Sequence, residues 1–477
     1  MSNPFLSLGF NSWSQKFFRG NVPAAAAAFL KYVTTSISSF TLRSTGTVDY
    51  EVDWGDGTTE SLTTNAPTHT YSSAGEYTIK VTPAEGSTYR PYFNNAVSDT
   101  SIASVSGTGG SRLGTTLLDA WEGASNMTSF NSNIDTSGVT NFTGTWSRCS
   151  SLTSFPLLDT SSGLSFSSAW YDCDSLTSFP SIDTSSGTSF SSAWQLCSGL
   201  TSFPSIDTSS GTNFNYTWYG CNSLTSFPLL DTSSGTNFSG AWQLCSGLTS
   251  FPLLDTSSGT SFNYTWSDCS SLTSFPLIDT SNAQFIYGAW RNCSGLTSFP
   301  LLDTSNATYF YYTWGGCSSL TSFPLLATSN VTNFNRTWFQ CSGLTSFPSI
   351  DTSSGIIFLS GWYECTSLTT FPLLNVSSGT DFRTAWYNCS SLTTFPANMF
   401  NTTGTLISVA FDQCWEHCAL SAQSIENILT SLDTNGASNI TLSISGGTNA
   451  AKTTWSAAAN TAYNNLITKG WTIAYNA

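Results

Sequence analysis

Apolar residues recur at one fixed interval along most of the chain. From Trp146 through Trp170 to Trp386 a tryptophan occupies every 24th position, and Cys, Leu, Phe and Leu or Ile follow it at spacings of three. The unit reads W-x-x-C-x-x-L-T-S-F-P-x-[LI]-D-T-S-S-G-x-x-F-x-x-[AT]. Units of roughly 20–50 residues that repeat in this way cannot bury a core alone, so they stack into a solenoid. The sequence therefore predicts a leucine-rich-repeat-like solenoid whose repeated apolar side chains point inward once per coil.

Local signals divide each coil into three parts. The spacing of Trp, Cys and Leu suits one or two turns of α- or 3₁₀-helix, whereas T-S-F-P-x-[LI] suits a short extended segment that proline keeps irregular. D-T-S-S-G is a turn in which the aspartate accepts bonds from downstream amides. If neighbouring coils bond through their backbones at about 4.8 Å, eleven coils form a rod on the order of 50 Å long.

The pattern changes on both sides of the repeat. Alternating residues between Tyr32 and Pro83 predict a small β-domain. The aromatic-rich segment before it is either an arm that docks on a partner or part of the packing of that domain. After the repeat we expect an α/β cap with helices at 421–432 and 450–469 and strands at 440–444 and 471–475; Ser421 would cap the first helix and Gly436 would stop it. The predicted domains are an N-terminal arm at 1–30, the β-domain at 31–90, a linker or N-terminal cap at 91–120, the solenoid at 121–418 and the C-terminal cap at 419–477.

Composition narrows the functional classes. Only 9% of the residues are charged, the net charge is −15, and the 13 Lys and Arg residues are scattered, so the chain lacks the basic surface of a nucleic-acid binder. No apolar run is long enough to insert into a membrane. The 13 cysteines include no C-x-x-C pair, and most follow the repeat. They are therefore expected to be small buried residues rather than zinc ligands or disulfides.

A column of aspartates is the first candidate for chemistry. Each is expected to cap the turn that follows it, although a column of bound calcium ions and a glycosidase pair of carboxylates about 5 Å apart are alternatives. Ala327 and Asn375 interrupt the column, and a motif present in every coil is not a unique active site. No other cofactor is expected. The column comprises Asp135, Asp159, Asp183, Asp207, Asp231, Asp255, Asp279, Asp303 and Asp351.

Tyrosines replace small polar residues before the tryptophan of several coils. Since other coils carry Ser, Asn or Gly there, we expect these rings at the surface, where sugar rings and protein partners dock on aromatic side chains. The alternative is that the rings pack along the rod or form a subunit interface. The candidate ligand-binding residues are Tyr216, Tyr264, Tyr287, Tyr309, Tyr311 and Tyr312.

Two other sets of residues suggest functions that we consider secondary. The column from Thr153 to Thr393 has the regular hydroxyls of an ice-binding face, but it also suits a plain polar surface. His69 with Asp53 or Asp56 could form an acid–base pair. No nucleophile or metal motif accompanies them, which favours a structural role.

Three resemblances add to this interpretation. W-x-x-C-x-x-L followed by F-P-x-L resembles the BspA-type leucine-rich-repeat surface proteins, although those usually carry Phe in place of Trp. W-G-D-G-T with H-T-Y and G-E-Y-T-I-K-V resembles the PKD-type β-sandwich domain. The ending G-W-T-I-A-Y-N resembles the close of many phage-borne repeat proteins.

These resemblances imply a non-enzymatic adhesion or receptor-binding protein of a virion, such as a phage tail fibre or surface protein, or of a cell surface. Its partners would be a host-surface glycan or protein, other virion or surface subunits, and further copies of itself as a homo-oligomer. The alternatives are an architectural virion or surface-layer subunit that contacts only other subunits, and a polysaccharide-degrading enzyme.

Overall fold

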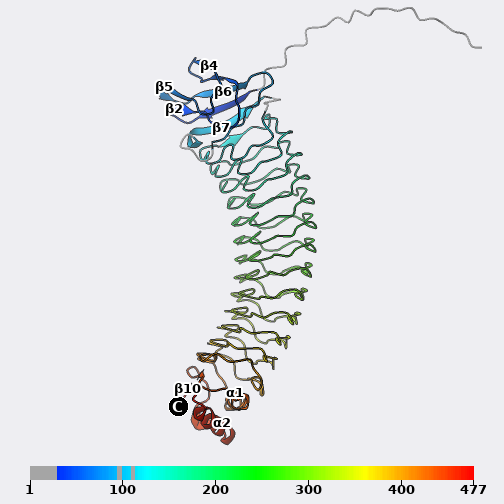
Figure 1. Cartoon of the computed structure of the whole chain (residues 1–477), viewed down its shortest axis with the longest axis vertical. Coiled ribbons are helices and arrows are strands. Elements are labelled where there is room, and N and C mark those ends of the chain that lie inside the picture. Colours follow the sequence, from blue (N-terminus) through cyan, green and yellow to red (C-terminus); the bar gives the residue numbers. More distant parts are fainter. Residues whose placement is uncertain (1–28, 94–98, 109–112) are drawn as a thin grey trace, which may run out of the picture.

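The protein is a long curved rod with a β-domain at one end and two helices at the other (Figure 1). This computed structural model describes residues 29–93, 99–108 and 113–477. The expected N-terminal arm at 1–30 lies almost entirely outside the described residues. Neither α-helix in the described part of the chain has the length and apolarity needed to cross a membrane.

The β-domain consists of two packed sheets. A larger sheet has the strand order β4-β3-β6-β1-β7-β8, and β2 pairs with β5 in a second sheet. Alternate residues of β1 and β6 point into a core formed with Tyr50, Val52 and Trp54. The strands are β1 (Leu30–Thr34), β2 (Ile37–Thr41), β3 (Tyr50–Asp53), β4 (Thr59–Leu62), β5 (Thr68–Gly75), β6 (Thr78–Pro83), β7 (Ile102–Gly107) and β8 (Ser129–Phe130).

The larger sheet continues into the solenoid. The 3₁₀ turn η1 (Asp99–Ser101) leads into β7, which pairs antiparallel with β1 and parallel with β8. The ring of Phe130 in β8 lies 5.2 Å from that of Trp146 in the repeat. Part of the range expected to be a linker or cap therefore belongs to the sheet, which joins the β-domain directly to the first coil.

This side of each coil is a series of tight turns rather than a helix or a strand. In the coil that begins at Phe142, Thr145 N–H donates to the carbonyl of Phe142 and Cys149 N–H to that of Trp146. The third residues of these turns, Gly144 and Arg148, have φ of +63° and +60°, as type II turns require. The helical turns expected from the Trp-x-x-Cys-x-x-Leu spacing are therefore absent from this coil.

These turns leave alternate backbone groups for the neighbouring coil. Phe142, Gly144, Trp146 and Arg148 all donate N–H to carbonyls of the next coil, at positions 165, 167, 169 and 171. Equivalent residues of adjacent coils also meet at isolated one-residue bridges, such as that of Asn141 with Ser165. The inter-coil bonds thus follow the sequence period without a regular sheet.

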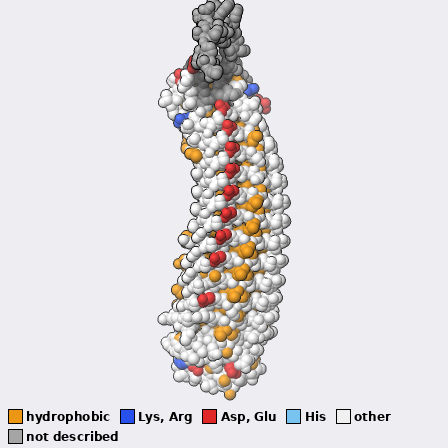
Figure 2. Space-filling model, turned by 90° about the vertical axis from the view of Figure 1, so that its right-hand side faces the viewer, with side chains coloured by type: hydrophobic (Ala, Val, Ile, Leu, Met, Phe, Trp, Pro, Cys, Tyr) orange, Lys and Arg blue, Asp and Glu red, His pale blue; other side chains and the backbone are white. Residues whose placement is uncertain are grey.

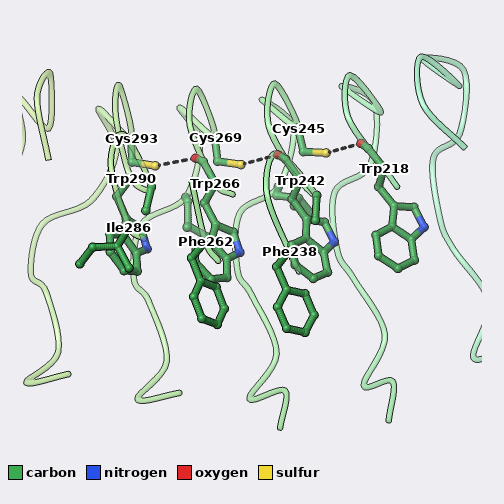
Figure 3. Close-up of a cluster of buried hydrophobic side chains, with 14 of the residues drawn as sticks. Trp218, Phe238, Trp242, Cys245, Phe262, Trp266, Cys269, Ile286, Trp290 and Cys293 are labelled. Atoms are coloured by element: carbon green, nitrogen blue, oxygen red, sulfur yellow. Dashed lines mark hydrogen bonds between the residues drawn. The ribbon is translucent and has the colours of Figure 1, made fainter. Parts of the chain in front are cut away.

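Continuous columns of rings and thiols fill the interior. Trp218, Trp242 and Trp266 are fully buried with ring centres 5.2 and 6.0 Å apart, and their planes are nearly parallel. The Sγ of Cys269 donates to the carbonyl of Trp242 at 3.1 Å, and the same bond recurs from coil to coil (Figure 3). All 13 cysteines are buried thiols.

Unequal spacing of the coils accounts for the curvature. Ring centres in the column of Phe227 and Phe251, which precedes the prolines, lie 6.2 Å apart. In the column of Phe214 and Phe238, beside the inter-coil bonds, they lie only 5.4 Å apart. The proline side of these coils is therefore convex, and it carries the aspartates (Figure 2).

The chain ends in an α/β unit that covers the last coil. α1 (Ala422–Asn435) begins at Ser421, whose hydroxyl accepts Ser424 N–H, and ends at Gly436 with φ of +83°. The second helix starts later than expected, because a 3₁₀ turn precedes Ser456, whose hydroxyl accepts Ala459 N–H as the N-cap. The other elements are β9 (Thr441–Ile444), η2 (Lys452–Thr454), α2 (Ala457–Thr468) and β10 (Thr472–Tyr475).

Candidate functional site

The six predicted tyrosines lie on one edge of the rod, which we call the tyrosine edge. They occupy a short stretch of the coil that runs from the inter-coil bridge to the first left-handed position. Tyr309 is a bridge residue, and Tyr287 and Tyr311 come two residues after a bridge residue. Tyr216, Tyr264 and Tyr312 occupy the left-handed position with φ of +54° to +55°.

Two of these rings extend over glycines of the following coil. A Cβ at Gly240 would lie 2.3 Å from the ring of Tyr216, and one at Gly288 would lie 2.3 Å from the ring of Tyr264. A left-handed side chain lies along the rod here, so the rings of Tyr216 and Tyr264 occupy the space that a side chain at Gly240 or Gly288 would need. The sequence carries a signal for this arrangement in the pairing of Tyr in one coil with Gly at the same position of the next.

Tyr312 is instead enclosed by two arginines. The guanidinium of Arg291, from the coil before, lies 5.4 Å from its ring centre, and that of Arg336, from the coil after, lies 5.2 Å away. Tyr311 contacts the same ring edge-on at 5.1 Å. None of the ion pairs among the described residues involves Arg291 or Arg336. This part of an acidic rod therefore carries two positively charged guanidinium groups, both in cation–π contact with one tyrosine ring.

Exposure within the tyrosine edge is uneven. Tyr309 is 49% exposed and Tyr216 is 36% exposed, whereas Tyr264, Tyr287, Tyr311 and Tyr312 are only partly exposed. Phe285, the bridge partner of Tyr309, is 45% exposed and was not among the predicted residues. Its signal was an aromatic residue where other coils carry Ser or Asn. Together Phe285 and Tyr309 form the most open aromatic surface of this edge.

A second series of rings follows the tryptophans toward the C-terminal end. Phe339, Tyr363 and Tyr387 stack at 4.8 and 4.9 Å with planes within 12° of each other. Because each ring covers the face of its neighbour, this series presents ring edges rather than faces. It stabilises the rod, as expected for rings that pack on one another.

The aspartate column caps turns. Oδ1 of Asp183 accepts the amide and the hydroxyl of Ser185 at 3.0 and 2.7 Å, and the same pair of bonds recurs at Asp159, Asp207, Asp231 and Asp255. Bonds from Ser185 lower the pKa of Asp183 and keep it ionised. The described residues contain no group of three or more His, Cys, Asp or Glu side chains that could hold a metal ion. The geometry supports the turn-cap interpretation of these aspartates.

Beside this column runs an exposed apolar stripe that sequence reasoning missed. The residue after each proline of the repeat points outward, and it is leucine in most coils, serine in three and alanine in the last, at Ala397. Its signal was the near restriction of that position to Leu or Ser. The stripe lies next to the aspartates (Figure 2). This leucine stripe comprises Leu157, Leu229, Leu253, Leu277, Leu301, Leu325 and Leu373, each 55–66% exposed.

The threonine column has its hydroxyls turned toward the rod. The Oγ1 of Thr201 donates to the carbonyl of Thr177 at 3.3 Å, and that of Thr249 to Thr225 at 3.2 Å. This bond recurs in most coils and uses the hydroxyl donor of the threonine there. Most of the column therefore lacks the free donors that the ice-binding hypothesis needs.

His69 has a structural environment in the β-domain. Its ring stacks on Trp54 at 5.0 Å, and Nε2 lies 2.8 Å from Oδ2 of Asp56. Hydrogen bonds from Thr58 and then from His69 lower the pKa of Asp56 to about 2. Gly55 has φ of +81°, and a Cβ there would lie 2.5 Å from the carbonyl of Thr78. The W-G-D-G-T segment is thus a tight turn fixed against β6.

A comparison with protein families decides what this domain is. The family model that matches residues 23–89 describes the PKD domain. The chain carries a PKD domain. The resemblance of W-G-D-G-T, H-T-Y and G-E-Y-T-I-K-V to that family is therefore confirmed.

The other comparisons concern the chain as a whole. No curated protein matches this sequence. Among solved structures, a leucine-rich repeat protein from Eubacterium ventriosum is similar, with 13% identity and a TM-score of 0.34 over 64% of this chain and 90% of that one. Beyond the PKD domain, the chemistry of the rod must be inferred from its own surfaces.

Proposed function

We propose that this chain is a non-enzymatic adhesion or receptor-binding protein of a virion or cell surface, and that the tyrosine edge makes the contact. Two observations on this edge carry the proposal: the rings of Phe285 and Tyr309 are exposed, and two guanidinium groups contact the ring of Tyr312, three residues after Tyr309. The PKD domain would serve as the attachment end and the rod as a spacer that presents this edge.

These residues favour a partner that carries both a flat apolar surface and a negative charge. Rings of Phe285 and Tyr309 offer apolar area, while Arg291 and Arg336 supply donors that match a carboxylate. An acidic glycan or an acidic protein loop has this chemistry. Several such weak contacts, or several copies on one particle, supply avidity without a deep pocket.

The test is a glycan-array and whole-cell binding screen with the full chain. Tyr309→Ala with Arg336→Gln should reduce binding at least tenfold, and Tyr171→Ala, a partly exposed tyrosine in a distant coil, should leave it unchanged. Unchanged binding in the first variant would remove these residues from the contact. Assembly into oligomers without any binding to cells or glycans would favour the architectural subunit, and release of sugars from host envelope would favour an enzyme.

A further inference from the structure

The leucine stripe and the aspartate column form a second surface, on a different face from the tyrosine edge. Five consecutive coils, from Leu229 to Leu325, carry leucines that are 61–66% exposed. Apolar side chains that line up over this length mark an interaction site more often than a plain surface. Four aspartates stand two residues after the first four of these leucines, at positions 231, 255, 279 and 303. The surface therefore has an apolar track with a parallel row of negative charge.

This surface has defined ends. On the N-terminal side the track stops at Ser205, and on the C-terminal side it stops at Ser349. Ala327 also replaces an aspartate at that end. Because both replacements are short, a hollow of about 330 Å³ opens there, lined by residues that include Leu325, Ala327, Ser349 and Asp351. A bulky apolar side chain at the end of a partner would fit this hollow.

The spacing of the track matches the surface of an α-helix. Phenylalanines two residues before these leucines have ring centres 5.9–6.2 Å apart from coil to coil. Residues i and i+4 of a helix are separated by about 6.0 Å along its axis, and they form a continuous ridge. Because the ridge is inclined by about 26° to the axis and turns around it, a helix that crosses the track at that angle would set about three successive ridge residues on successive leucines.

Charge decides between occupants. A second copy of this chain would place another aspartate row near the first, and the chain has only 13 Lys and Arg to offset 28 Asp and Glu. An anionic membrane would be repelled for the same reason. A helix with Lys or Arg beside its apolar ridge would instead pair with the aspartates, whose serine bonds leave Oδ2 outside the turn.

We propose that the coils from Leu229 to Ser349 dock a cationic amphipathic α-helix of another protein. The helix would lay an i, i+4, i+8 apolar ridge on the leucine stripe, set its basic residues toward the aspartate column, and insert its last apolar residue beside Ala327. Area burial supplies the attraction, and the charges select the orientation and the partner.

The test uses a designed probe and the full chain. The probe is an 18-residue helix, stapled on its far face, with Leu at every fourth position and Lys on either side of each Leu. Binding is measured by fluorescence anisotropy in 50 mM and 500 mM salt. Leu277→Ser and Asp279→Asn probe the surface, and Leu157→Ser and Asp159→Asn are matched controls outside it. These variants should fold, because other coils carry Ser or Asn at the same positions, as at Ser181 and Asn375.

We expect Leu277→Ser to weaken binding of the probe about tenfold. Asp279→Asn should weaken it about two- to fivefold in low salt and not in high salt. The matched controls should bind as the parent does. Three outcomes would overturn the proposal: no binding of the probe at millimolar concentration, equal binding of a peptide with the same residues in scrambled order, or equal loss in the controls. Self-association abolished by Leu277→Ser, without binding of the probe, would assign the surface to a second copy.

Discussion

In the tryptophan column, favourable ring packing is opposed by a buried N–H group that has no hydrogen-bond partner, and two substitutions can separate these effects. Trp242 is fully buried and contacts five rings at 4.8–6.3 Å, those of Trp218, Trp266, Phe227, Phe238 and Phe251. Its indole Nε1 is buried without a hydrogen-bond partner, as are those of the other tryptophans in the repeat. The ring therefore stabilises the coil by packing while its N–H destabilises it through lost hydration.

These opposing effects give different results for Trp242→Ala and Trp242→Phe. Removing the whole ring should cost about 3–5 kcal/mol, with about 0.5–1.5 kcal/mol more for each aromatic pair that disappears. Phenylalanine keeps a ring in the stack. Its smaller volume should cost roughly 1–2 kcal/mol, which relief of the buried N–H, at about 1–3 kcal/mol, offsets. We expect Trp242→Phe to change the free energy of unfolding by no more than about 1 kcal/mol.

Hydrogen exchange followed by mass spectrometry is the appropriate assay. Coils contact only their neighbours, so an effect at Trp242 should appear in peptides from 214 to 270 rather than along the whole rod. Denaturant titration followed by circular dichroism gives the global comparison. The reasoning is refuted if Trp242→Phe destabilises these coils as strongly as Trp242→Ala does.

The β-domain turn, the buried thiols and the left-handed residues are open to similar tests. Asp56→Asn should lower the protection of β3 and β4 from hydrogen exchange by about 1 kcal/mol or less at pH 7. The pKa of Asp56 in the folded chain is about 2, below its ordinary value of 3.8. The stability that Asp56 contributes is therefore present above pH 4 and is lost as the pH falls toward 2. Burial raises the pKa of the Cys245 thiol to about 12. Ellman's reagent at pH 8 should therefore label few thiols in the native chain and all 13 in denaturant. Rapid labelling of the native chain would contradict the burial of the cysteine column. Leu244 has φ of +63°. Leu244→Gly should therefore raise the free energy of unfolding by up to about 1 kcal/mol, and Leu244→Val should lower it. The reverse order would show that packing outweighs backbone strain there.

The inward residues of the rod could be predicted because they repeat without exception. Trp, Cys and Leu keep their spacing through the coils from Trp146 to Trp386, and one constant period is enough to align equivalent residues in space. The ends of α1 were also predictable, because Ser421 and Gly436 carry specific capping chemistry. The PKD domain was recognisable from a short turn motif whose first glycine has one geometric role.

The local backbone of the coils could not be predicted in the same way. Apolar residues three apart suit a helix, but here they belong to successive type II turns with left-handed residues between them. That conformation usually requires glycine, and this chain places Leu196, Tyr216 and Thr384 there. Inter-coil bonds override the local preference, which is information that no single coil contains.

Surface roles were the hardest to predict. The tyrosines were predicted as candidates, but the sequence did not show that Arg291 and Arg336 enclose Tyr312. The outward position after the proline was overlooked, because a leucine beside an inward leucine looks like core. Only the path of the extended segment in the structure distinguishes the two positions, because it leaves Leu229 exposed and Leu230 buried.

The coil-to-coil bonds have a consequence for how such a molecule changes over generations. Each donor reaches the equivalent acceptor of the following coil, whichever coil it belongs to, as Phe166 reaches Ser189 and Phe190 reaches Asn213. Loss or gain of one whole unit by unequal recombination therefore restores every bond across the junction. The length of the rod therefore changes in steps of one coil. One such step separates the ring centres of Trp170 and Trp194 by 5.1 Å and those of Trp194 and Trp218 by 6.0 Å. Outside the coils from Tyr216 to Ser349, the rod can thus change in length without disturbing either proposed surface.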